Sequence, residues 1–166
     1  LVTELVFLPY HGVFEPALLL PILTIFTIFI TIFGIFVCNI YCKKTKTEDA
    51  KEVVIDEVAG FFVAVVIVWL FYFVLLKIEG VDKTFSSYLP LSPIFILVIF
   101  VLFRIFDIAK PWHIGRCDKN IKGGLGIMLD DVVAGIHTGL VFILLYLLCY
   151  YTDLLDFLLA RAFPSF

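Results

Sequence analysis

Four long apolar runs constrain this sequence more than any other feature. They lie at about residues 17–42, 58–77, 91–108 and 132–151. Each run is close to the roughly 20 residues that a helix needs to cross a hydrocarbon layer about 30 Å thick. Because 63% of the residues are hydrophobic and only 16% are charged, the chain has too few polar side chains for a water-soluble surface. The sequence therefore predicts an all-α integral membrane protein, a bundle of four full transmembrane helices.

A shorter apolar segment precedes the first long run. Residues 1–10 are mostly apolar but too few to span a bilayer, and His11, Gly12 and Pro16 separate them from the run that follows. Residue 1 is Leu, and no basic stretch introduces a short apolar segment as in a signal peptide. We expect residues 1–166 to form one membrane-embedded domain, with a short N-terminal apolar segment and with its N-terminal part lying before residue 1.

The positive charges are divided unevenly between the connecting loops. Eight of the twelve Lys and Arg residues lie in the loops 43–57 and 109–131. Cytoplasmic loops of membrane proteins carry the excess of Lys and Arg, so both loops are predicted to face the cytoplasm. The net charge of −3 argues against a nucleic-acid partner, because phosphate backbones are bound by an excess of basic residues.

Acidic pairs stand at the start of two of the apolar runs. Asp56 and Glu57 open the second run, and Asp130 and Asp131 open the fourth. Carboxylates are favoured at helix N-termini, so helix capping is one interpretation of both pairs. Small residues follow each pair at helical spacing and favour close helix packing; they are Gly60, Ala64, Ala134, Gly135, Thr138 and Gly139. If these stripes meet, four carboxylates converge, and a magnesium ion would relieve their repulsion.

Two further polar features border the same loops. Arg104 and Asp107 lie three residues apart near the end of the third run, where ionisable groups usually face a bundle interior or a polar cavity. A structural ion pair is the alternative to a functional role. Gly123, Gly124 and Gly126 precede the fourth run and would allow backbone N–H groups to approach an anion. A glycine-rich turn without a ligand is the commoner use of such a pattern.

Three segments resemble motifs of the phosphatidylglycerophosphatase A family. They are residues 54–60 (VIDEVAG), 103–112 (FRIFDIAKPW) and 123–135 (GGLGIMLDDVVAG). The motifs occur in the family's order, and the resemblance covers about residues 30–140. It implies a phosphoric monoester hydrolase of glycerophospholipid biosynthesis that uses Mg²⁺ to convert phosphatidylglycerophosphate to phosphatidylglycerol and phosphate. It also implies a multi-pass protein of the bacterial inner membrane, surrounded by membrane lipids, with its active site on the cytoplasmic side.

The resemblance extends to individual polar positions, from which candidate roles follow. The metal-ligand candidates are Asp56, Glu57, Asp130 and Asp131, the phosphate clamps are Arg104 and Lys110, the backbone donors to phosphate are Gly123, Gly124 and Gly126, and the candidate base or nucleophile is Asp107 or Asp118. Two departures from the family pattern matter. His113 stands where the family usually has a second Pro, and the family's N-terminal motif is not found in this chain.

Two other classes of membrane protein also carry charges near their helices. An ion-coupled transporter or channel would place charges near the bilayer midplane or in repeated helices, whereas these charges gather at one face and no repeat is visible. A lipid-linked phosphotransferase also uses several Asp residues with magnesium, but its spaced Asp-Gly and Ala-Arg motif is missing. His137 lies within the fourth run and fits a packed histidine better than a catalyst. The identity of the nucleophile and the oligomeric state stay open.

Overall fold

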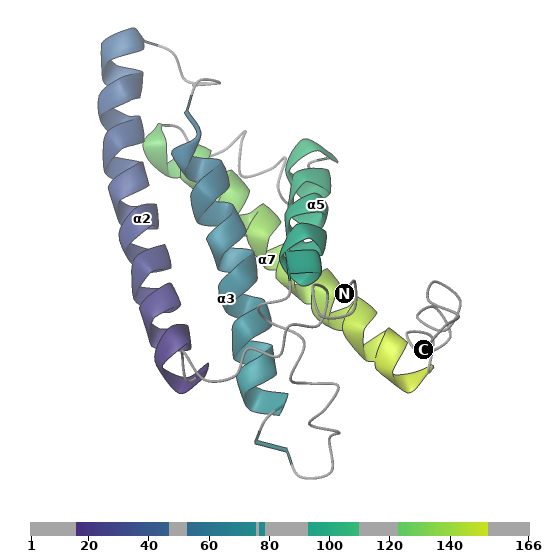
Figure 1. Ribbon diagram of the computed structural model, residues 1–166. Coiled ribbons are helices and arrows are strands. Elements are labelled where there is room, and N and C mark those ends of the chain that lie inside the picture. Colours follow the sequence, from purple (N-terminus) through teal and green to yellow (C-terminus); the bar gives the residue numbers. More distant parts are fainter. Residues whose placement is uncertain (1–15, 47–52, 76, 79–92, 110–122, 153–166) are drawn as a thin grey trace.

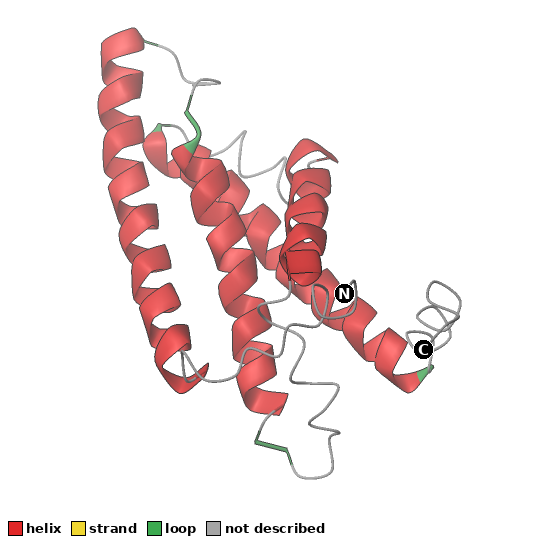
Figure 2. Cartoon of the chain, in the orientation of Figure 1, coloured by secondary structure: helices red, strands yellow, loops and turns green. Residues whose placement is uncertain are grey.

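The computed structural model describes residues 16–46, 53–75, 77–78, 93–109 and 123–152 (Figure 1). These ranges contain four helices, and none of their residues forms a strand (Figure 2). The helices are α2 (Pro16–Thr45), α3 (Ile55–Leu75), α5 (Pro93–Ala109) and α7 (Gly124–Tyr151). The prediction of an all-α fold is therefore confirmed.

Three of the four helices are long and apolar enough to cross a membrane, namely α2, α3 and α7. The fourth, α5, has 17 residues. At a rise of 1.5 Å per residue it extends about 26 Å, slightly less than the thickness of a hydrocarbon layer. The expectation of four full transmembrane helices is thus met by three of the described helices, while α5 falls just short of full length.

The outward faces of the helices carry large apolar side chains. Ile25 and Phe29 of α2 and Leu144 of α7 are each more than 60% exposed. Such surfaces are costly in water but suit contact with lipid chains. The hydroxyl groups of Thr24 and Thr27 donate to backbone carbonyls four residues earlier at 2.7 Å, which satisfies these polar groups within α2.

Helices α3 and α7 form the most extensive interface of the bundle. Their backbones touch at glycines: a Cβ atom at Gly135 would collide with the carbonyl oxygen of Gly60, and one at Gly60 would collide with the carbonyl of Asp131. Ala64 and Thr138 are completely buried further along the two helices. The expected packing of the two small-residue stripes is confirmed, and it fixes the first turns of α3 beside the second turn of α7.

Helix α7 begins at Gly124, well before the predicted start near residue 132. Its first turn therefore contains no acidic residue, and Asp130 and Asp131 lie in the second turn. The expectation that this pair opens the helix was wrong. Because the helix dipole acts mainly on groups in the first turn, capping does not account for these two carboxylates. Asp56 and Glu57, in contrast, do lie in the first turn of α3.

The arrangement brings several helix termini to one end of the bundle. The C-terminal ends of α2 and α5 lie near the N-terminal ends of α3 and α7 (Figure 1). Phe103 of α5 is 1% exposed and packs in a cluster with Ala134 of α7 and Phe61 of α3. This cluster holds α5 against the α3 and α7 pair directly below the charged residues.

Candidate active site

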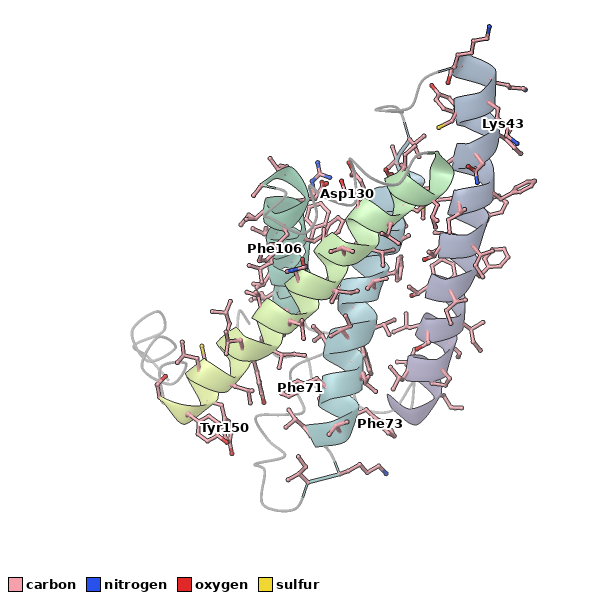
Figure 3. All side chains as sticks on the ribbon, turned by 180° about the vertical axis from the view of Figure 1, so that it is seen from behind. Lys43, Phe71, Phe73, Phe106, Asp130 and Tyr150 are labelled. Atoms are coloured by element: carbon pink, nitrogen blue, oxygen red, sulfur yellow. The ribbon has the colours of Figure 1, made fainter. Side chains whose placement is uncertain are left out.

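Five carboxylates from three helices gather at this end of the bundle. They are Asp56 and Glu57 of α3, Asp107 of α5, and Asp130 and Asp131 of α7. Figure 3 shows Asp130 at this end of the bundle, close to the end of α5. We call these five residues the acidic cluster. Lys110 and Asp118, the predicted phosphate clamp and candidate base, lie outside the described residues.

Asp131 is the centre of the acidic cluster. It is only 5% exposed, and its neighbour Asp130 only 4%. Asp56, Asp107 and Asp130 all act on Asp131 as nearby negative charges, and the Asp107 carboxyl is within hydrogen-bonding reach of it. Carboxylates crowded in a site with little water repel one another strongly unless a cation or a shared proton intervenes. Asp56 of α3 and Asp107 of α5 thus lie within electrostatic range of the aspartate pair of α7.

Arg104 links α5 to α3 at the edge of the acidic cluster. Its Nη1 atom lies 2.7 Å from Oε2 of Glu57 and 2.9 Å from Oδ2 of Asp107. The Arg104 side chain is 35% exposed, so part of the guanidinium group can still meet a ligand. The pairing with Asp107 agrees with the spacing of the two residues in the sequence. The pairing with Glu57 crosses between helices and was not anticipated.

Glu57 was expected to bind the metal ion together with the aspartates. The structure instead places its carboxylate against Arg104. The Asp56 carboxylate, one residue earlier, accepts a hydrogen bond from the Glu57 backbone N–H at 3.0 Å. In the described part of the chain Arg104 forms ion pairs with Glu57 and Asp107, so Glu57 is the member of this acidic pair that contacts the guanidinium group.

The chemistry of the acidic cluster suits a hard cation such as Mg²⁺, because carboxylate oxygens are its preferred protein ligands. Among the side chains that the structure describes, no three His, Cys, Asp or Glu residues form a group that could hold a metal ion. A closed protein cage is not needed for Mg²⁺, which usually keeps several waters and binds through one or two carboxylates plus substrate phosphates. Asp56, Asp130 and Asp131 remain suitable ligands in that open mode.

The glycine segment before and within the first turn of α7 packs tightly on α2. Gly123 has φ 79°, in the left-handed region that favours glycine. A Cβ atom at Gly124 would lie 2.5 Å from the carbonyl oxygen of Ile35 and 2.6 Å from the backbone nitrogen of Asn39. The Gly124 N–H donates to Asn39 Oδ1 at 2.9 Å, and the Gly126 N–H donates to the Gly123 carbonyl at 3.0 Å. Both N–H groups are used within the protein, whereas they were expected to be open to phosphate.

Asn39 is the residue near the site that sequence reasoning missed. It lies in α2, in a long apolar run, and it connects that helix to the N-terminus of α7 through its side-chain carbonyl. Helix N-termini leave backbone N–H groups without partners in the helix, and a side-chain oxygen from another helix can satisfy one of them. A single amide side chain within a membrane helix was the available signal, because such groups often bind across helices.

His137 lies deeper in α7 than the acidic cluster. Its Nδ1 atom is 2.8 Å from the carbonyl oxygen of Val133, and its ring lies 6.2 Å from the ring of Phe106, centroid to centroid. These contacts confirm the prediction of a packed, hydrogen-bonded histidine. Figure 3 labels Phe106 on α5, and its contact with His137 shows that its ring lies against α7.

Comparison with known proteins connects this arrangement to lipid phosphatases. The family model described as phosphatidylglycerophosphatase A matches residues 1–146. A phosphatidylglycerophosphatase A of Escherichia coli is 31% identical over 103 residues, which are 62% of this chain and 48% of the relative. The corresponding Haemophilus influenzae protein is 31% identical over 120 residues, which are 72% of this chain and 61% of the relative.

A third relative carries a different name. A Bacteroides thetaiotaomicron protein with the provisional name phosphatidylinositol-3-phosphatase is 34% identical over 108 residues, which are 65% of this chain and 55% of the relative. The chain thus spans about half of the length of the curated relatives it matches, from 48% to 61%. No solved structure matches it significantly.

Proposed function

Because this chain belongs to the phosphatidylglycerophosphatase A family, we propose that it hydrolyses phosphatidylglycerophosphate to phosphatidylglycerol and inorganic phosphate. The observation that supports this activity is the meeting of Arg104 with five carboxylates from three helices at one end of an apolar bundle. A phosphomonoester on a lipid anchor reacts at the membrane surface, where these groups lie at helix ends. The reaction would be a step of glycerophospholipid biosynthesis.

The same arrangement supports a proposal for the membrane location. The relatives come from bacteria, and three of the described helices are long enough to span a membrane. We place the protein in the bacterial inner membrane. Lys43 and Lys44 lie in the last turn of α2, at the same end as the acidic cluster, which supports a cytoplasmic position for this end because cytoplasmic loops carry the excess of basic residues.

The residues of the site have different proposed roles in binding and hydrolysing the phosphate. Asp56, Asp130 and Asp131 would hold Mg²⁺, which when bound neutralises the charge on the phosphoryl oxygens. Arg104 is partly exposed and can donate N–H groups to the same oxygens. Asp107 lies between Arg104 and Asp131 and is the described candidate to accept the proton of an attacking water or to attack phosphorus itself.

Transport of ions is the alternative activity, and the distribution of charge does not favour it. A pathway across the membrane would need polar groups near the midplane of the bundle. The charged residues of α2, α3 and α7 lie within the first or last turns, or in the second turn for Asp130 and Asp131. The middle of each of these helices carries no Asp, Glu, Lys or Arg.

A comparison of substrates tests the proposed function. Purified protein in detergent micelles would be given phosphatidylglycerophosphate, phosphatidylinositol 3-phosphate or soluble glycerol 3-phosphate, with release of inorganic phosphate as the readout. Arg104→Ala protein, prepared in the same way, measures contaminating phosphatase. We expect the fastest release from phosphatidylglycerophosphate. Release no faster than with Arg104→Ala would refute the activity, and a clear preference for phosphatidylinositol 3-phosphate would change the substrate to the one in the Bacteroides relative's name.

A further inference from the structure

Asp56 and Glu57 are neighbours in the first turn of α3, and among the ion pairs of the described residues it is Glu57 that bridges to α5. Successive residues of a helix point about 100° apart, so adjacent side chains on α3 can face α7 and α5 separately. The charge of Asp56 acts on Asp131 of α7. The carboxylate of Glu57 lies 2.7 Å from Arg104 of α5. The charge of Asp131 also acts on Arg104, so the Glu57–Arg104 pair borders the aspartates.

Arg104 is held from two sides. Glu57 approaches Nη1 from α3 at 2.7 Å, and Asp107 approaches the same atom from α5 at 2.9 Å. A guanidinium group has five N–H donors, so two carboxylates leave several of them for a phosphate. A long Arg side chain loses rotamer freedom when it binds a ligand, and fixing it beforehand removes much of this loss from the binding step.

We infer that Glu57 is a positioning residue, which holds the Arg104 guanidinium group in place to bind the phosphate of the lipid headgroup. The metal ligands are then the aspartates around Asp131. The inference rests on the proposed function for its substrate. It changes the role that the sequence assigned to Glu57, from metal ligand to partner of the phosphate clamp. It also gives α3 two separate tasks, because Asp56 remains with the metal ligands.

Glu57→Gln separates the two roles, because it keeps the size of the side chain and removes its charge. Asp131→Asn is the matched control on the metal side. Binding of Mn²⁺ in place of Mg²⁺ to purified protein without lipid, followed by electron paramagnetic resonance, gives a readout that does not depend on turnover. We expect Glu57→Gln to bind Mn²⁺ as the parent does and Asp131→Asn to bind it at least about tenfold more weakly. Equal weakening in both variants, or no Mn²⁺ binding by the parent, would overturn the inference.

The kinetic arm asks whether Glu57 acts through Arg104. Loss of a partly exposed ion pair is expected to raise KM for phosphatidylglycerophosphate about fivefold in Glu57→Gln, with a smaller change in kcat. Because Arg104→Ala serves as the inactive reference, the double-mutant comparison uses binding of phosphatidylglycerophosphate: Glu57→Gln should weaken it in the parent and weaken it no further in an Arg104→Ala background, since its target is gone. Equal effects in both backgrounds would show a role independent of Arg104. If the parent released no phosphate, the proposed function would fail, while Mn²⁺ binding would still decide whether Glu57 is a ligand.

Discussion

Substitution of Gly60 by Ala perturbs the acidic cluster without touching any charged residue. A Cβ atom at this position would lie 2.8 Å from the carbonyl carbon of Asp131 and 2.8 Å from Cε2 of Phe103, where ordinary contacts begin at 3.4 Å. One of these neighbours is backbone and cannot rotate away. Helices α3 and α7 must therefore separate by roughly half an ångström or more at the level of Asp131.

Two opposing terms set the effect on stability. Overpacking of this kind costs about 1–3 kcal/mol, while replacing Gly by Ala within a helix gains about 1 kcal/mol. We expect a net loss of roughly 0–2 kcal/mol, which leaves the protein folded. We expect the effect on the catalytic rate to be larger than the effect on stability, because a misplacement of about 1 Å can reduce turnover about a hundredfold. A loss of about tenfold in phosphate release is the expected result for Gly60→Ala.

Gly34→Ala is the matched control for this experiment. A Cβ atom at Gly34 would meet Cε and Sδ of Met128 at 2.6 Å, but these atoms end a flexible side chain that can move aside. The assay is phosphate release from phosphatidylglycerophosphate, together with thermal unfolding in detergent for both variants. We expect Gly34→Ala to keep the parent rate. The same rate and the same Tm for both variants would refute the view that backbone contact between α3 and α7 places the site.

Three further predictions concern other parts of the molecule. Asp131→Asn should lower the rate of phosphate release at least a hundredfold with little change in Tm, whereas His137→Ala should lower Tm and keep most of the turnover. The reverse pattern would indicate that His137, and not Asp131, takes part in catalysis. Asn39→Asp keeps an acceptor for the Gly124 N–H, so it should retain far more activity than Asn39→Leu. Asn39→Leu should lower the free energy of unfolding by about 1 kcal/mol. Equal behaviour of the two variants would show that Asn39 does not cap α7. In a background without the four native cysteines, Lys43→Cys should react with a membrane-impermeant reagent only after the cells are opened, and labelling in intact cells would reverse the topology.

The helices were predictable because long apolar runs have few possible structures in a membrane. The crossing of α3 and α7 was predictable as well, since Gly60 and Gly135 lie in stripes of small residues. The start of α7 was not, because glycine has low helix propensity and the sequence placed a loop there. Burial of Gly124 against α2, with Asn39 accepting its N–H, extends the helix over the glycines.

The same limit applies within the site. The Arg104 and Asp107 pair follows from spacing on a single helix. The pair of Arg104 with Glu57 depends on where α5 lies against α3, and no local pattern in the sequence encodes that position. For this reason Glu57 was grouped with Asp56 by proximity in the chain, although its carboxylate lies 2.7 Å from Nη1 of Arg104 on α5.

We propose that hydrolysis of the lipid phosphomonoester at the acidic cluster depends on a metal ion. The most direct test is the rate of phosphate release from phosphatidylglycerophosphate by purified protein, first in excess chelator and then after Mg²⁺ is restored. We predict that the rate falls to the level of Arg104→Ala in chelator and recovers with Mg²⁺. An undiminished rate in excess chelator would contradict the claim.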